Sequence, residues 1–159
     1  MSQKTLSKWM KLIIILLGLC GAAAYGVIVP VVGRNLTADY PEFAYCFAPW
    51  FVFLLLTAIP CYTVLVLGWK IASSIKADQS FSFKNAKRLK CVAILALATS
   101  IYLFAGNFVF LLLNMNHPSI LLASMIIVFV GISISVASAV LSYLVKKAAQ
   151  LQEQSDLTI

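Results

Sequence analysis

Few of the residue types that perform chemistry occur in this chain, and they form no recognised motif. His117 is the only histidine among 159 residues, alongside four cysteines and five acidic residues. Cys20, Cys46, Cys61 and Cys91 lack C-x-x-C spacing, which argues against a zinc site or a redox pair. The sequence also has no P-loop, H-E-x-x-H or G-x-S-x-G motif. We therefore expect a protein that is not an enzyme and that binds no metal and no cofactor.

Amide, hydroxyl and glycine residues recur at helical spacing within two apolar runs of the second half. Small residues let helix backbones approach closely in lipid, and hydroxyl and amide groups bond across helices. The pattern predicts a polar seam between two helices, made of Ser100, Asn107, Asn114, Gly131, Ser135, Ser138 and Ser142. Helix packing is the favoured interpretation. A ligand or ion site is the alternative, although no charged residue accompanies Asn107 in its run.

The composition requires these helices to lie in a membrane. Hydrophobic residues make up 62% of the chain and charged residues only 11%, against about 25% in soluble domains. Four runs without charge reach the roughly 20 residues needed to cross a bilayer core, and none alternates like a barrel strand. The predicted fold is all-α, an integral membrane bundle of four transmembrane helices. We expect helices at 12–32, 50–70, 83–113 and 119–148.

The distribution of Lys and Arg predicts the orientation of these helices. The N-terminal segment, the loop at 71–82 with Lys70 before it and the start of the third helix after it, and the tail at 149–159 with the residues before it hold 11 of the 12 cations. Only Arg34 falls in the opposite loops, 33–49 and 114–118. The positive-inside rule therefore places both termini in the cytoplasm and the protein in the cytoplasmic membrane. A cleaved signal peptide is disfavoured because the first apolar run continues to Val32.

The stretch SFSFKNAKRLK, residues 80–90, predicts a helix that begins before the membrane. Ser82 is a suitable N-cap, and no residue up to 113 breaks the helix. The cations on its first turns oppose the helix dipole, so anionic lipid headgroups or a protein partner are expected to contact them. These cations are Lys84, Lys87, Arg88 and Lys90. Direct nucleic-acid binding is not expected, because the basic run is short and adjoins the membrane.

Three further features suggest contacts at the ends and faces of the helices. The turn Asn116, His117 and Pro118 is expected to cap a helix rather than to catalyse a reaction. The C-terminal tail is a docking candidate through Leu151, Asp156, Leu157 and Ile159, although its apolar residues could also be incidental. Small residues at Gly18, Ala22 and Gly26 predict close packing, either within the chain or in a homo-oligomer or larger complex.

Four segments resemble a known bacterial membrane family, domain of unknown function 2975. They are FSFKNAKRLK, GNFVFLLLNMNHPSILL, FVGISISVASAVLSYLVKKAAQLQ and SDLTI. The chain departs from the family pattern at Lys84, where an acid often precedes the asparagine, at Ser119, where glycine follows the proline, and at Gln154, where glutamate is usual. The resemblance implies a four-helix membrane protein, often encoded beside a small helix-turn-helix regulator.

Together these features support three hypotheses about function. The first is a bacterial membrane regulator that binds a cytosolic helix-turn-helix transcription factor. The second is a small transporter, channel or immunity-type protein that uses the polar seam. The third is a subunit of a larger membrane complex, with the Gly18, Ala22 and Gly26 face as its contact.

Overall fold

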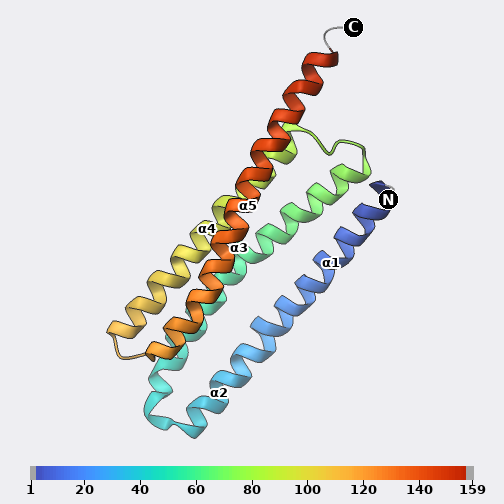
Figure 1. Cartoon of the computed structure of the whole chain (residues 1–159). Coiled ribbons are helices and arrows are strands. Elements are labelled where there is room, and N and C mark those ends of the chain that lie inside the picture. Colours follow the sequence, from blue (N-terminus) through green and yellow to red (C-terminus); the bar gives the residue numbers. More distant parts are fainter. Residues whose placement is uncertain (1–2, 157–159) are drawn as a thin grey trace.

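The chain consists of long helices, as the computed structural model of residues 3–156 shows (Figure 1). The elements are α1 (Gln3–Ala23), η1 (Ala24–Ile28), α2 (Val29–Asp39), η2 (Pro41–Phe43), α3 (Ala44–Lys76), α4 (Phe83–Leu112) and α5 (Pro118–Asp156). Four helical stretches are long and apolar enough to cross a membrane: Gln3–Asp39, Pro41–Lys76, Phe83–Leu112 and Pro118–Ser155. The prediction of an all-α protein with four transmembrane helices is confirmed.

The first membrane helix is longer than expected, because α1, η1 and α2 form one continuous rod. The π-helical turn η1 lies just before Pro30, which lacks an N–H and would clash with the preceding turn of an α-helix. The rod ends at Tyr40, where φ is −131° and ψ is 77°. Proline disfavours the helical conformation in the residue before it, so Pro41 sets this boundary. The loop expected at 33–49 is therefore mostly helical.

The other helices match the expected ones in their cores and extend beyond them at several ends. The side chain of Ser82 caps α4 by accepting a hydrogen bond from the Asn85 N–H, as predicted. Helix α3 begins six residues earlier than expected and ends six later, and α5 continues through Asp156. With 39 residues α5 is about 58 Å long, nearly twice the thickness of a bilayer core.

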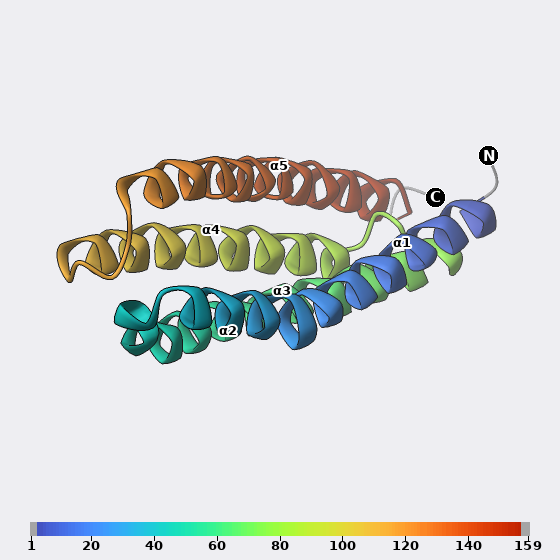
Figure 2. The same cartoon turned by 90° about the horizontal axis from the view of Figure 1, so that it is seen from below.

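The helices pack as an open row in chain order rather than as a closed bundle. Figure 2 shows α4 between α5 and α3, with α1 in front of α3. Helix α1 packs on α3, α3 on α4, and α4 on α5, and the last pair has the most extensive contact. Over residues 3–156, α1 and α5 do not contact each other. Each of these two helices therefore keeps most of its circumference for lipid or a partner.

The antiparallel arrangement separates two chemically different ends of the molecule. At one end lie the start of α1, the loop 77–82 and the end of α5 (Figure 1). We call this the basic end, because it gathers all the described cations except Arg34. At the opposite end, called the aromatic end, lie the corner at 40–43 and the turn at 113–117.

Candidate functional site

A hydrogen-bonded network around Asn85 and Arg88 fixes the basic end. The Asn85 side chain is only 1% exposed, and its Nδ2 donates to the carbonyl oxygens of Gln79 at 3.0 Å and Ser80 at 3.2 Å. Its Oδ1 accepts from Arg88 Nη1 at 2.9 Å. Asn85 therefore joins the 77–82 loop to the first turn of α4. The sequence did not predict this role, because Asn85 gains its loop partners only when the chain folds back at 77–82.

Arg88 differs from the neighbouring lysines because its guanidinium points into the protein. Its Nη1 also donates to the Lys70 carbonyl at 3.1 Å and to Ser74 Oγ at 2.8 Å, near the C-terminus of α3. A cation there interacts favourably with the carbonyls of the last helical turns. Arg88 is thus an α3–α4 tie through Nη1, a role that was not predicted, and its contact with a headgroup or partner stays a prediction. The side chains of Lys84, Lys87 and Lys90 are exposed.

Helix α1 is attached to the same end by three further contacts. Ser7 is 1% exposed and donates from Oγ to the Ala72 carbonyl at 2.6 Å. Gln3 Nε2 donates to Asp78 Oδ1 at 2.7 Å. The Lys11 ammonium lies 4.8 Å from the centre of the Trp69 ring, a distance suited to a cation–π interaction. The basic end is therefore an ordered surface to which all four membrane helices contribute.

The end of α5 extends past the start of α4. Ser142 donates to the Ala86 carbonyl at 2.7 Å, so the residues of α5 after about 146 run beyond the first turn of α4. Ala149 is buried there, facing a hollow that Phe81 and Phe83 also line. Leu151 is 59% exposed. Asp156 is the last residue of α5, whereas Leu157 and Ile159 lie outside the described residues.

The predicted polar seam joins α4 to α5 through serines and a glycine. Ser135 Oγ donates to the Ala93 carbonyl at 2.8 Å, in addition to the Ser142 bond. Ser100 Oγ lies against Gly131 so closely that a Cβ at that position would overlap it. Ser138 is half-buried on α5. These contacts account for the seam as a packing surface.

The two asparagines predicted in the seam have different environments. Asn107 is buried, and its Nδ2 donates to the Leu103 carbonyl at 2.9 Å while its Oδ1 accepts from Asn116 Nδ2 at 3.1 Å. Asn114 is exposed and has a positive φ of 55°, a conformation that asparagine tolerates at a helix end. Asn114 therefore belongs to the turn, and its predicted place in the seam is wrong.

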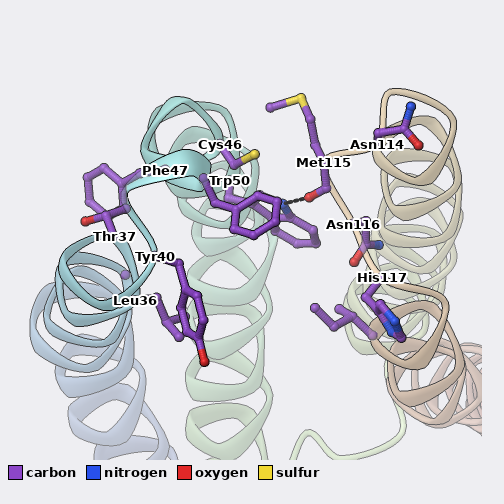
Figure 3. Close-up of a pocket in the computed structure, with 13 residues that line it drawn as sticks. Leu36, Thr37, Tyr40, Cys46, Phe47, Trp50, Asn114, Met115, Asn116 and His117 are labelled. Atoms are coloured by element: carbon purple, nitrogen blue, oxygen red, sulfur yellow. Dashed lines mark hydrogen bonds between the residues drawn. The ribbon is translucent and has the colours of Figure 1, made fainter.

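The aromatic end contains a mostly apolar pocket of about 490 Å³ (Figure 3). Its walls come from α2, the corner before α3, the first turns of α3, the 113–117 turn and the start of α5. Trp50 Nε1 donates to the Met115 carbonyl at 2.8 Å, which joins α3 to the turn across the pocket. The lining residues are Gly33, Leu36, Thr37, Tyr40, Phe43, Cys46, Phe47, Trp50, Asn114, Met115, Asn116, His117 and Ile120.

Aromatic rings of α3 and α4 pack against Trp50, which lines the pocket. Phe53 lies 5.8 Å from Trp50, 5.2 Å from Phe110 and 4.8 Å from Tyr102, measured between ring centres. The Phe53 ring also lies directly on Gly106, where a Cβ would overlap it. Glycine at 106 therefore allows the ring to pack on the α4 backbone. This aromatic cluster was not predicted from the sequence.

His117 caps α5, in agreement with its expected role in the turn. The backbone N–H of Ser119 donates to His117 Nδ1 at 3.2 Å, and the Ile120 N–H donates to the His117 carbonyl at 2.9 Å. Pro118 occupies the first helical position, where its missing N–H costs no hydrogen bond. His117 as the cap and Pro118 as the first helical residue therefore begin α5.

The small-residue face of α1 is divided between contact and exposure. Gly18 accepts a hydrogen bond from Tyr62 at 3.0 Å and packs on Leu65, whereas Ala22 and Gly26 are exposed. The α1–α3 contact continues through Tyr25, whose hydroxyl lies 2.8 Å from Thr57 Oγ1. Packing within the chain thus uses only part of the predicted face.

The comparisons with known proteins agree with this architecture. The sequence model of the family "Protein of unknown function (DUF2975)" matches residues 31–159. The chain belongs to this family. It is also 31% identical over 153 residues to "Uncharacterized membrane protein YoaS" of Bacillus subtilis (strain 168), covering 95% of this chain and 96% of that protein. No solved structure matches the chain. The DUF2975 match includes α3, α4, α5 and nearly all of α2, and therefore the pocket and the part of the basic end that α3, α4 and α5 form, without the start of α1.

Proposed function

We propose that this DUF2975 protein is a non-enzymatic regulator in the bacterial cytoplasmic membrane, whose basic end binds a cytosolic helix-turn-helix protein. The observation that carries the proposal is the combination of ordered cations and a projecting helix end at one face. The family resemblance supplies the class of partner. Since the docking surface is basic, the complementary surface of the partner is expected to be acidic.

The orientation needed for this function follows from the charge distribution. Eleven cations and three acidic residues give the segments of the basic end a formal net charge of +8 (11 minus 3), whereas the whole chain carries +7. Such a concentration of Lys and Arg on one side is the usual mark of the cytoplasmic face. Both termini are then cytoplasmic, and the aromatic end faces outward.

Two kinds of contact are available at the basic end. Lys84, Lys87 and Lys90 lie on the first turns of α4, where anionic lipid headgroups attract each cation by about 1 kcal/mol. Leu151 lies farther out on α5 and offers an exposed apolar side chain to a partner. We expect the lysines to serve both lipid and partner, and the α5 end to provide the contact that is specific to the protein partner.

The test measures binding of the purified regulator to the full chain in nanodiscs. Leu151→Asp should weaken binding at least tenfold, because it places a charge in an apolar contact. Gln150→Asp is the matched control, since it introduces the same charge at the neighbouring exposed position and should change binding less than threefold. Equal effects of the two variants, or no binding by the wild-type protein, would contradict the proposal.

The lysines can be tested in the same assay. Replacing Lys84, Lys87 and Lys90 with glutamine should weaken binding and reduce its dependence on salt. Nanodiscs with and without anionic lipid separate the two roles of these lysines. If the triple variant loses binding only when anionic lipid is present, the lysines act through lipid and not through the partner.

Transport along the polar seam remains the alternative, with weaker support. Asn107 and the seam serines form hydrogen bonds within the protein, which favours packing over a solute path. Asn107→Leu separates the two functions. It should abolish any transport or resistance that depends on the seam, whereas the regulator should lose only some stability.

A further inference from the structure

We infer that the pocket at the aromatic end binds a small aromatic molecule that carries one hydrogen-bond donor. This inference is independent of docking at the basic end. The volume of about 490 Å³ lies within the usual range for ligand pockets, which are mostly apolar with a few polar groups. The lining has this composition, with Tyr40, Phe43, Phe47 and Trp50 as aromatic walls.

The aromatic walls of the pocket are already in place without a ligand. The Trp50 indole is held by its hydrogen bond to the Met115 carbonyl and by packing on Phe110, with 4.8 Å between the ring centres. The Phe47 ring lies against Gly33 of α2, where any Cβ would overlap it. A side chain at residue 33 would therefore displace this wall. Rigid aromatic walls favour a flat aromatic ligand, because offset-stacked and edge-to-face contacts suit such rings.

One polar atom in the pocket wall lacks a partner. Asn116 Nδ2 donates to Asn107 Oδ1 and to the Asn107 carbonyl, which fixes the orientation of the amide. Its Oδ1 is buried and accepts no hydrogen bond within the described part of the chain. Figure 3 shows this oxygen turned toward the Trp50 side and the nitrogen turned away. Buried acceptors usually have partners. This oxygen is closed off from the pocket space, so a donor on the ligand would complete the site when the side chains around Asn116 shift on binding.

The shape of the pocket also explains how a ligand could enter. Helix α2 and the start of α5 border the pocket but do not contact each other in the described chain. Leu36 of α2 is 54% exposed and Ile120 of α5 is 49% exposed. The open row of helices thus leaves a lateral entrance between these two side chains. An acyl chain could use the same entrance, but it has no donor for Asn116.

The test uses two pairs of probes that differ only in the donor. Indole is compared with 1-methylindole, and 2-naphthol with 2-methoxynaphthalene, by ligand-observed NMR with the full chain in nanodiscs and empty nanodiscs as background. We expect the donor-bearing member of at least one pair to bind at least fivefold more tightly than its methylated partner. Leu36→Trp should fill the pocket and abolish this binding. Val31→Trp, at an exposed position outside the pocket, should preserve it.

Three results would overturn the inference. The first is equal binding within both pairs, which would mean that Asn116 recognises no donor. The second is an equal effect of the two tryptophan variants, which would place the binding elsewhere. The third is that no probe binds above the background of empty nanodiscs. This includes the case in which a lipid co-purifies with the wild-type protein but not with Leu36→Trp, because that lipid would then fill the pocket.

Discussion

Replacing Asn85 with alanine should strongly destabilise the basic end of the protein. The side chain makes two hydrogen bonds to loop carbonyls and one to the Arg88 guanidinium. A neutral hydrogen bond contributes about 0.5–1.5 kcal/mol to stability, and one to a charged group about 1.5–3 kcal/mol. The loop carbonyls can regain water at the surface, so the expected loss is about 2–4 kcal/mol, below the sum.

Two companion variants separate the contributions of Asn85. Asn85→Asp keeps an acceptor for Arg88 but turns an oxygen toward the carbonyls of Gln79 and Ser80, so it should also destabilise the loop. Lys84→Ala removes an exposed side chain next to Asn85, and its effect should stay within about 0.5 kcal/mol. Unfolding of the purified protein by dodecyl sulfate in mixed micelles measures all three variants.

The reasoning about Asn85 would be refuted by a specific pattern. If Asn85→Ala unfolds at the same detergent fraction as Lys84→Ala, the network does not stabilise the basic end. If Asn85→Asp is as stable as the wild type, the contacts to the loop carbonyls contribute nothing and only the Arg88 contact matters.

Two further predictions concern contacts between the helices. Gly106→Ala should destabilise the protein by about 1–3 kcal/mol, because the new Cβ overlaps an aromatic ring of α3, whereas Gly26→Ala meets open space and should be neutral or stabilising. Ser135→Ala and Ser142→Ala should each cost about 0.6 kcal/mol, the average for a hydrogen bond between membrane helices. Ser133→Ala should cost less, because that hydroxyl bonds only within its own helix.

These variants can be compared by thermal unfolding in one detergent. Equal melting temperatures for the two glycine variants would show that the ring can move away from α4 without loss. A larger effect at Ser133 than at the two other serines would contradict the assignment of the α4–α5 contact.

The helices could be predicted because their signals are local. Charge-free runs of sufficient length identify membrane helices, and Ser82 is a helix cap whatever its neighbours are. The spacing of serines and Gly131 was enough to predict a seam, because period and helix geometry fix one face. The early end expected for the first helix was wrong because the polar residues after Val32 continue the helix, and only Pro41 forces the break.

The contacts at both ends depend on which helices become neighbours, and the sequence did not reveal this. Arg88 resembles a surface cation until α3 lies beside it and presents the Lys70 carbonyl. Trp50 and Met115 are 65 residues apart. They meet only because α3 packs beside α4, which brings the first turns of α3 next to the 113–117 turn. The open row of helices could not be predicted for the same reason, because the sequence does not show which helices become neighbours.

Photo-crosslinking in intact cells tests the docking proposal most directly. A photoreactive residue at Leu151 should give an adduct that contains the helix-turn-helix regulator, because this exposed position lies at the proposed cytoplasmic surface. The same residue at Leu113, exposed at the aromatic end, should give none. An adduct from Leu113, or the absence of regulator from the Leu151 adducts, would contradict the proposal.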